Sequence, residues 1–231
     1  MYSFKKITHL VLAAFSILTS SIATAQNDLS GHWEGQANLF SGLVEISFDI
    51  VKNSDDSYAG TISQPQEGIR HLPLLAAKAE NNSVQLVARE DQPFNGTLTA
   101  DGQRIDGALD AAGYEVPLSL TRSGDAQIQT ADPIPAVANE FTGTWKGNIA
   151  DTQVEMNITN NSDGTATAAI INLSQGRLTI PAASINVDGT QITLDLVAIS
   201  GSYSGNVNDD ASAIEGTFTQ GSAQMPLNFS K

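Results

Sequence analysis

The sequence GHWEG at residues 31–35 returns as GTWKG at residues 143–147, and this recurrence decides how the rest of the chain is read. Working outward, the residues from Val44 to about Val87 pair with those 108 positions later. One residue is then gained, the offset becomes 109, and Phe94-Asn95-Gly96 falls on Tyr203-Ser204-Gly205. The chain therefore holds two copies of one folding unit, residues 31–122 and 143–231.

The apolar residues of both copies recur with a period of two. Val44, Ile46, Phe48 and Ile50 alternate with polar residues, which is the pattern of a strand with one buried face. One stretch, residues 74–80, has helical propensity, but its copy at 182–188 has the pattern of a strand and a turn. Because two copies of one unit should share a structure, we predict strands in both places.

Short clusters of Asn, Asp and Gly separate the predicted strands, so the sequence predicts an all-β chain. We expect two tandem antiparallel up-and-down β-barrel-like domains of about eight strands each, because closure removes exposed sheet edges. Two β-sandwiches are the alternative. In the second copy the strands are predicted to begin near Gly143, Thr152, Thr165, Thr179, Gln191, Ser202, Ala213 and Ala223.

The predicted domain boundaries are a signal peptide at 1–25, repeat 1 at 26–122, a linker at 123–138 and repeat 2 at 139–231. Lys5 and Lys6, an apolar run and Ala23-Thr24-Ala25 have the pattern of a secretory signal with cleavage before Gln26. The apolar run is too short to span a bilayer, and we expect no integral membrane segment after cleavage. A periplasmic or secreted location follows, with the oligomeric state left open.

The charge and the missing cysteines exclude several classes of function. The signal peptide carries two Lys and no acids, so the mature charge is 9 minus 25, or −16. A surface this acidic repels phosphate backbones, and we expect no nucleic-acid partner. The chain has no cysteine, which rules out disulfides, thiolate metal sites and Cys nucleophiles.

The G-x-W on the first strand resembles the opening of the lipocalin and avidin barrels, where the Trp plugs one barrel end. The longer pattern, from G-x-W-x-G through aromatic-x-G and I-x-G to a final Pro-Leu strand, resembles a small secreted β domain. That domain is found on the N-terminal side of exported α/β-hydrolases and β-lactamase-like serine hydrolases. The resemblance covers nearly the whole mature chain twice and implies a barrel fold and an envelope hydrolase as a partner. The hydrolase itself has no counterpart in this sequence.

No catalytic machinery stands out, and we predict no enzyme, no cofactor and no metal. The elbow G-x-S-x-G is absent: residues 201–205 read GSYSG, with Tyr203 at the centre. The S-x-x-K at Ser3 lies in the signal peptide. His32 and His71 are expected to face solvent, and acidic pairs such as Asp209-Asp210 to stabilise turns.

The aromatic residues at matched places are the candidate ligand-binding residues, although they also suit a filled barrel core. They are Trp33, Phe94, Trp145 and Tyr203. An eight-stranded barrel is just wide enough for side chains or one small ligand. We therefore expect an exported, non-catalytic binding or accessory protein of the bacterial cell envelope. Its ligand would be a small apolar molecule, a glycan or a partner enzyme. The alternative is a hydrolase-associated protein, or a hydrolase with an unrecognised active site.

Overall fold

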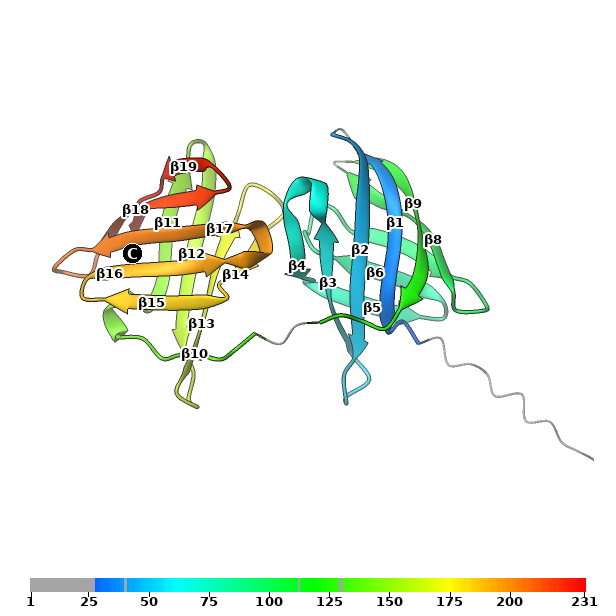
Figure 1. The fold of residues 1–231 in the computed structure, drawn as a ribbon, viewed down its shortest axis with the longest axis horizontal. Coiled ribbons are helices and arrows are strands. Elements are labelled where there is room, and N and C mark those ends of the chain that lie inside the picture. The colour runs from blue at the N-terminus through cyan, green and yellow to red at the C-terminus, as the bar shows by residue number, and fades with distance from the viewer. Residues whose placement is uncertain (1–27, 40, 112, 129–130) are drawn as a thin grey trace, which may run out of the picture.

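The structure, a computed structural model, describes residues 28–39, 41–111, 113–128 and 131–231. The predicted signal peptide lies outside the described residues. Figure 1 shows two β domains side by side, one for each sequence copy. Among the described residues the strands form two antiparallel sheets, β1–β9 and β10–β20, and neither sheet mixes strands of the two copies. The prediction of two tandem barrel-like domains is therefore confirmed.

Barrel 1 is a closed ring. In order around the ring its strands are β1, β2, β3, β5, β6, β7, β8 and β9, and β9 pairs with β1 again. The inward residues are those of the apolar alternation, such as Trp33 and Phe48. The strands are β1 (Gly31–Leu39), β2 (Gly42–Lys52), β3 (Tyr58–Gln64), β4 (Ile69–Pro73), β5 (Ala76–Glu80), β6 (Ser83–Val87), β7 (Phe94–Leu98), β8 (Arg104–Ala111) and β9 (Tyr114–Gly124), with the 3-10 turn η1 (Pro65–Glu67) after β3.

The sequence predicted about eight strands in this copy, and the sheet has nine. The additional strand is β4, which the prediction did not separate from its neighbour. β4 pairs with the second half of β3, as at Ile62 and Leu72, whereas β5 pairs with the first residue of β3, Tyr58. On this side β3 thus pairs with both β4 and β5, and β4 lies outside the ring. The stretch with helical propensity contains β5, so its assignment as a strand is confirmed.

Barrel 2 repeats most of this arrangement, but β10, and not the β5 counterpart β15, pairs with the start of β13. Its sheet runs β10-β13-β12-β11-β20-β18-β17-β16-β15, with β14 on β13 and β19 on β18. The strands are β10 (Ile134–Pro135), β11 (Gly143–Ile149), β12 (Thr152–Asn160), β13 (Thr165–Asn172), β14 (Leu178–Pro181), β15 (Ser184–Asp188), β16 (Gln191–Leu196), β17 (Gly201–Val207), β18 (Ala213–Gln220), β19 (Ala223–Pro226) and β20 (Phe229–Ser230), with η2 (Asn139–Phe141) and η3 (Val197–Ile199).

Strand β10 comes from the predicted linker. It pairs Ile134 with Ala166 and Pro135 with Thr165 on β13. Ala166 is the counterpart of Tyr58, the residue through which barrel 1 closes onto β5. In barrel 2, β10 of the connecting segment therefore pairs at the position where β5 pairs to close the ring of barrel 1.

The two tryptophans have the same surroundings in both barrels, which explains the repeated G-x-W. Trp33 Nε1 donates a hydrogen bond to Leu29 O (2.9 Å), and Trp145 Nε1 donates one to Phe141 O (2.8 Å). A cation covers each indole: the Arg122 guanidinium lies 4.4 Å from the centre of Trp33, and Lys231 Nζ lies 4.5 Å from that of Trp145. Each ring is thus held in its barrel core by a hydrogen bond and a cation–π contact.

Paired glycines explain the aromatic-x-G and I-x-G motifs. Gly96 faces Gly107 across β7 and β8, and Gly205 faces Gly216 across β17 and β18. A Cβ on Gly205 or Gly216 would lie 2.6 or 2.5 Å from the Tyr203 hydroxyl oxygen. The missing side chains therefore leave the space that the aromatic ring fills.

The Tyr203 hydroxyl has no hydrogen-bond partner in the interior of barrel 2, and burial raises its pKa. An unpaired buried hydroxyl costs about 1–3 kcal/mol. We expect Tyr203→Phe to raise the free energy of unfolding by about 1 kcal/mol, and the matched Phe94→Tyr to lower it by about 1–3 kcal/mol. Denaturant melts of both variants measure this. If Tyr203→Phe lowered stability, an unseen partner of the hydroxyl would be indicated.

Candidate functional site

The four aromatic residues predicted as ligand contacts lie in the barrel cores. Trp33, Phe94, Trp145 and Tyr203 are each 0% exposed. Phe94 packs against Phe48, with ring centres 6.2 Å apart, and Tyr203 meets Phe229 edge to face at 5.2 Å. These contacts are with other core side chains, so the structure places the four residues where they fill the barrels.

A different group of residues gathers on the outer face of barrel 1. In the β1–β2 hairpin His32 lies opposite Asp49, and Glu34 lies opposite Ser47. Because their neighbours Trp33 and Phe48 point inward, these four side chains point outward. Strand β4 brings His71 to the same place, where its backbone N–H donates to Ser63 Oγ at 2.9 Å. We call His32, Glu34, Asp49 and His71 the polar cluster.

Asp49 is the centre of the polar cluster, with only 2% of its side chain exposed. His32 Nδ1 lies 2.7 Å from its Oδ1, and the backbone N–H of Gln127 donates to the same oxygen at 2.7 Å. His71 Nδ1 lies 3.8 Å from the other oxygen, Oδ2. Gln127 belongs to the segment after β9, so the chain between the barrels passes over Asp49 and helps to bury it.

His32 is held between two carboxylates. Its Nε2 lies 3.0 Å from Glu34 Oε1, opposite the contact of Nδ1 with Asp49. Burial disfavours the charged ring, but the hydrogen bonds and charges of Asp49 and Glu34 outweigh it and raise the pKa of His32 above 6.5. The expectation of a solvent-facing His32 is wrong: its side chain is 15% exposed. The alternation correctly places His32 on the outer face, but the burial of its side chain depends on Asp49 and Gln127, which reach it only in the tertiary structure.

The raised pKa of His32 predicts a pH dependence of stability. The protonated ring contributes fully below pH 6.5, and this contribution is lost as the pH rises through the higher pKa of the folded state. We expect the stability difference between the wild type and His32→Gln to be largest near pH 6 and to shrink toward pH 9. Denaturant melts across this range measure it. A difference that grew with pH would contradict the arrangement of charges.

A surface depression of about 380 Å³ adjoins the polar cluster and shares Glu34 with it. Its charged walls are the carboxylates of Glu34 and Glu45, whose counterparts in copy two are Lys146 and Gln153. The counterpart of Ser47 is Glu155, which lies opposite Lys146, so the two carboxylates of barrel 1 are replaced in barrel 2 by one acid and one base. The depression is lined by Glu34, Gly35, Gln36, Glu45, Ile46, Ser47 and Pro65.

Copy two does not carry the polar cluster. The counterparts of His32, Asp49 and His71 are Thr144, Asn157 and Thr179. The Asn157 side-chain oxygen is buried and has no hydrogen-bond partner among the residues that the structure describes. Sequence reasoning missed the cluster, although one signal was present: three positions that are titratable in copy one are neutral in copy two.

The acidic turns act locally. Asp55, Asp163 and Asp210 each accept, at 2.6 Å, a hydrogen bond from a Ser or Thr hydroxyl two residues later. These hydroxyl contacts lower the pKa of all three carboxyls. Within the described part of the chain no group of three or more His, Asp or Glu side chains is arranged to hold a metal ion. Nor do the described residues form a helix long and apolar enough to cross a bilayer.

Comparisons with known proteins are sparse. No protein-family model and no curated protein matches the chain. Among solved structures, the chain is similar to a protein of unknown function of the DUF3598 family from Nostoc punctiforme PCC 73102. The two share 14% identity over 87% of this chain and 94% of that chain, with a TM-score of 0.26.

Proposed function

We propose that this chain is an exported, non-catalytic accessory protein of the bacterial cell envelope that binds a partner through the outer face of barrel 1. One observation carries the proposal: large side chains fill both barrels, while the titratable residues that distinguish the copies lie outside barrel 1. A filled eight-stranded barrel leaves little room for a ligand. As a binding partner, an envelope enzyme on the outer face therefore fits better than an apolar molecule inside a barrel. A glycan on the outer face is the alternative partner.

The sequence supports export and the class of partner. Residues 1–25 have the pattern of a secretory signal, which favours a periplasmic or secreted location. The resemblance to domains that accompany exported serine hydrolases favours an enzyme of the envelope. Glu34 and Glu45 suit a basic patch on that enzyme, because opposite charges steer association and suppress wrong partners.

An exchange of residues between the copies tests this proposal. Glu34→Lys with Glu45→Gln gives barrel 1 the residues that barrel 2 has at these two positions, and Lys146→Glu with Gln153→Glu is the matched control. The mature protein is immobilised and exposed to solubilised envelope proteins, and the retained hydrolases are then titrated singly. We expect the first variant to lose at least tenfold in affinity and the control to keep it. Equal binding by both variants would refute the acidic face as the site.

One observation favours a hydrolase as the second candidate. The His71 side chain is 40% exposed, and its Nδ1 faces the buried Asp49 carboxylate at 3.8 Å. An exposed imidazole near a buried carboxylate has the residue types of a general base and its partner. Our proposal expects only background hydrolysis of ester, β-lactam and peptide substrates. Turnover that His71→Gln abolishes would establish the second candidate instead.

A further inference from the structure

The two barrels contact each other through equivalent elements. β4 of barrel 1 and β14 of barrel 2 are counterparts in the repeat, and so are the loop 88–93 and η3. β4 contacts both β14 and η3. In return, the loop reaches the start of β14, where the Glu90 N–H donates to Gly176 O at 2.8 Å. Figure 1 shows β4 at the edge of barrel 1 that faces barrel 2.

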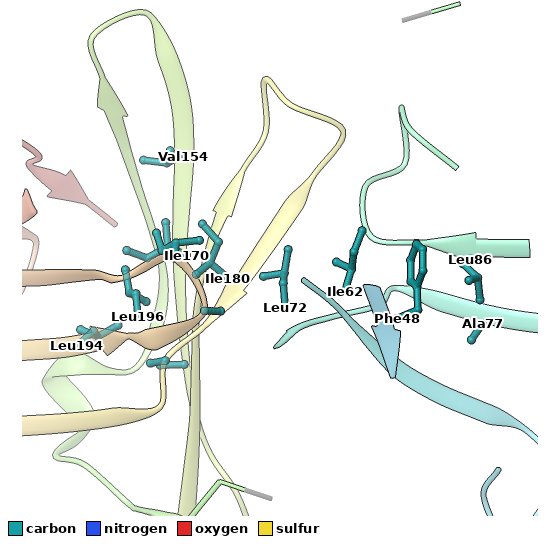
Figure 2. Close-up of a cluster of buried hydrophobic side chains, with 14 of the residues drawn as sticks. Phe48, Ile62, Leu72, Ala77, Leu86, Val154, Ile170, Ile180, Leu194 and Leu196 are labelled. Atoms are coloured by element: carbon teal, nitrogen blue, oxygen red, sulfur yellow. The ribbon is translucent and has the colours of Figure 1, made fainter. Parts of the chain in front are cut away.

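Side chains from both barrels fill this contact. Leu178 of β14 completes a small cavity whose other walls belong to barrel 1, among them Ile69, Leu72 and Gln92. Leu72 and its counterpart Ile180 are 1% and 7% exposed. Figure 2 shows Leu72 between the strands of the two barrels, on the side of Ile180.

At the edge of this contact, polar residues of the two barrels lie close to one another. Arg177 Nε lies 3.9 Å from Glu90 Oε1. A Cβ on Gly176 would collide with Asp91, so only glycine permits this approach. Its counterpart Gly68 has open space around the same position, which shows that the two halves of the contact are equivalent in their elements and different in detail.

Reciprocal contact between equivalent elements is the pattern of an isologous interface, in which the same patch is used on both sides. We propose that this surface, formed by β4 with the loop 88–93 and by β14 with η3, also fits a second copy of this chain. In such a dimer barrel 1 of each chain docks on barrel 2 of the other, and every contact described above is kept.

The connection between the barrels decides which pairing forms. The Gln127 N–H is bonded to Asp49 and β10 is paired with β13, so residues 128–133 form the connection between these two fixed points. A short tether gives an effective concentration of about millimolar, and pairing within one chain is favoured at micromolar protein. Deleting residues 129–132 leaves two connecting residues and shortens the reach by about 13 Å. Pairing between chains then becomes the way to keep the interface.

Crosslinking tests the proposal directly, because the chain has no cysteine of its own. Glu90→Cys with Arg177→Cys places two thiols at the contact, and a short bismaleimide joins them. We expect an internally crosslinked monomer with the natural tether and a covalent dimer after deletion of 129–132, measured by intact mass. The control pair Glu34→Cys with Lys146→Cys, which lies away from the contact, should give at least tenfold less dimer.

A shortened chain that stays monomeric up to 1 mM, or a control pair that crosslinks equally well, would overturn the proposal. A second experiment covers the case in which the shortened chain does not fold. Single variants Glu90→Cys and Arg177→Cys of the full-length tether are mixed in equal amounts at high concentration and crosslinked. We expect the dimer that joins the two different variants to make up well over half of all crosslinked dimers. A 1:2:1 distribution of the three possible dimers, as in random pairing, would contradict the proposal.

Discussion

Replacing Trp33 or Trp145 with alanine should lower the free energy of unfolding of its own barrel by about 3–5 kcal/mol. Both indoles are fully buried, both donate a hydrogen bond to a backbone carbonyl, and both lie under a cation. A loss of this size removes much of the stability of a small domain. Each substitution should therefore unfold mainly one half of the chain.

The measurement is a thermal melt of each variant followed by hydrogen exchange of both halves. Leu43→Ala is a suitable control, because Leu43 is one of the exposed large apolar side chains. Melting that is unchanged in both tryptophan variants would show that the indoles do not hold the barrels together.

Replacing Asp49 with alanine should cost barrel 1 about 3 kcal/mol, because removing one partner of a buried charged pair leaves the other uncompensated. His32 and the Gln127 N–H would both lose their 2.7 Å acceptor. The matched variant is Asn157→Ala, at the same repeat position. Within the described part of the chain its side-chain oxygen has no partner to lose, and we expect a cost below about 1 kcal/mol.

Denaturant melts of the two variants make this comparison within one protein. Asp49→Ala should also expose the segment after β9, which protease cleavage near Gln127 would detect. Equal costs for the two variants would show that the polar cluster contributes nothing beyond what its neutral counterpart does.

The sequence was most informative where the two copies agree. Alternation at residues such as Val44 and Phe48 predicted the strands, and the repeated motifs predicted two separate units with Trp33 and Trp145 at equivalent places. Agreement with a copy also corrected the helical propensity around residues 74–80, where β5 forms. These features are local or periodic, and a sequence records them directly.

Features that depend on a few long-range contacts could not be predicted. The two residues of β10 are too few to show an alternation, and their pairing with β13 depends on where the connecting chain passes. The polar cluster requires the register that sets His32 opposite Asp49 and a backbone at His71 with a φ of 48°. Neither is written in composition or spacing, so the site was missed while the fold was found.

Our main claim is that each copy forms its own sheet and folds without the other. Its most direct test is to produce the two halves separately, as residues 26–128 and 131–231. A second fragment begun at residue 136 would omit β10, whose pairing with β13 belongs to barrel 2. We predict a β-type circular dichroism spectrum and a cooperative melt for each fragment alone. Two unfolded fragments that regain structure only when mixed would contradict the claim.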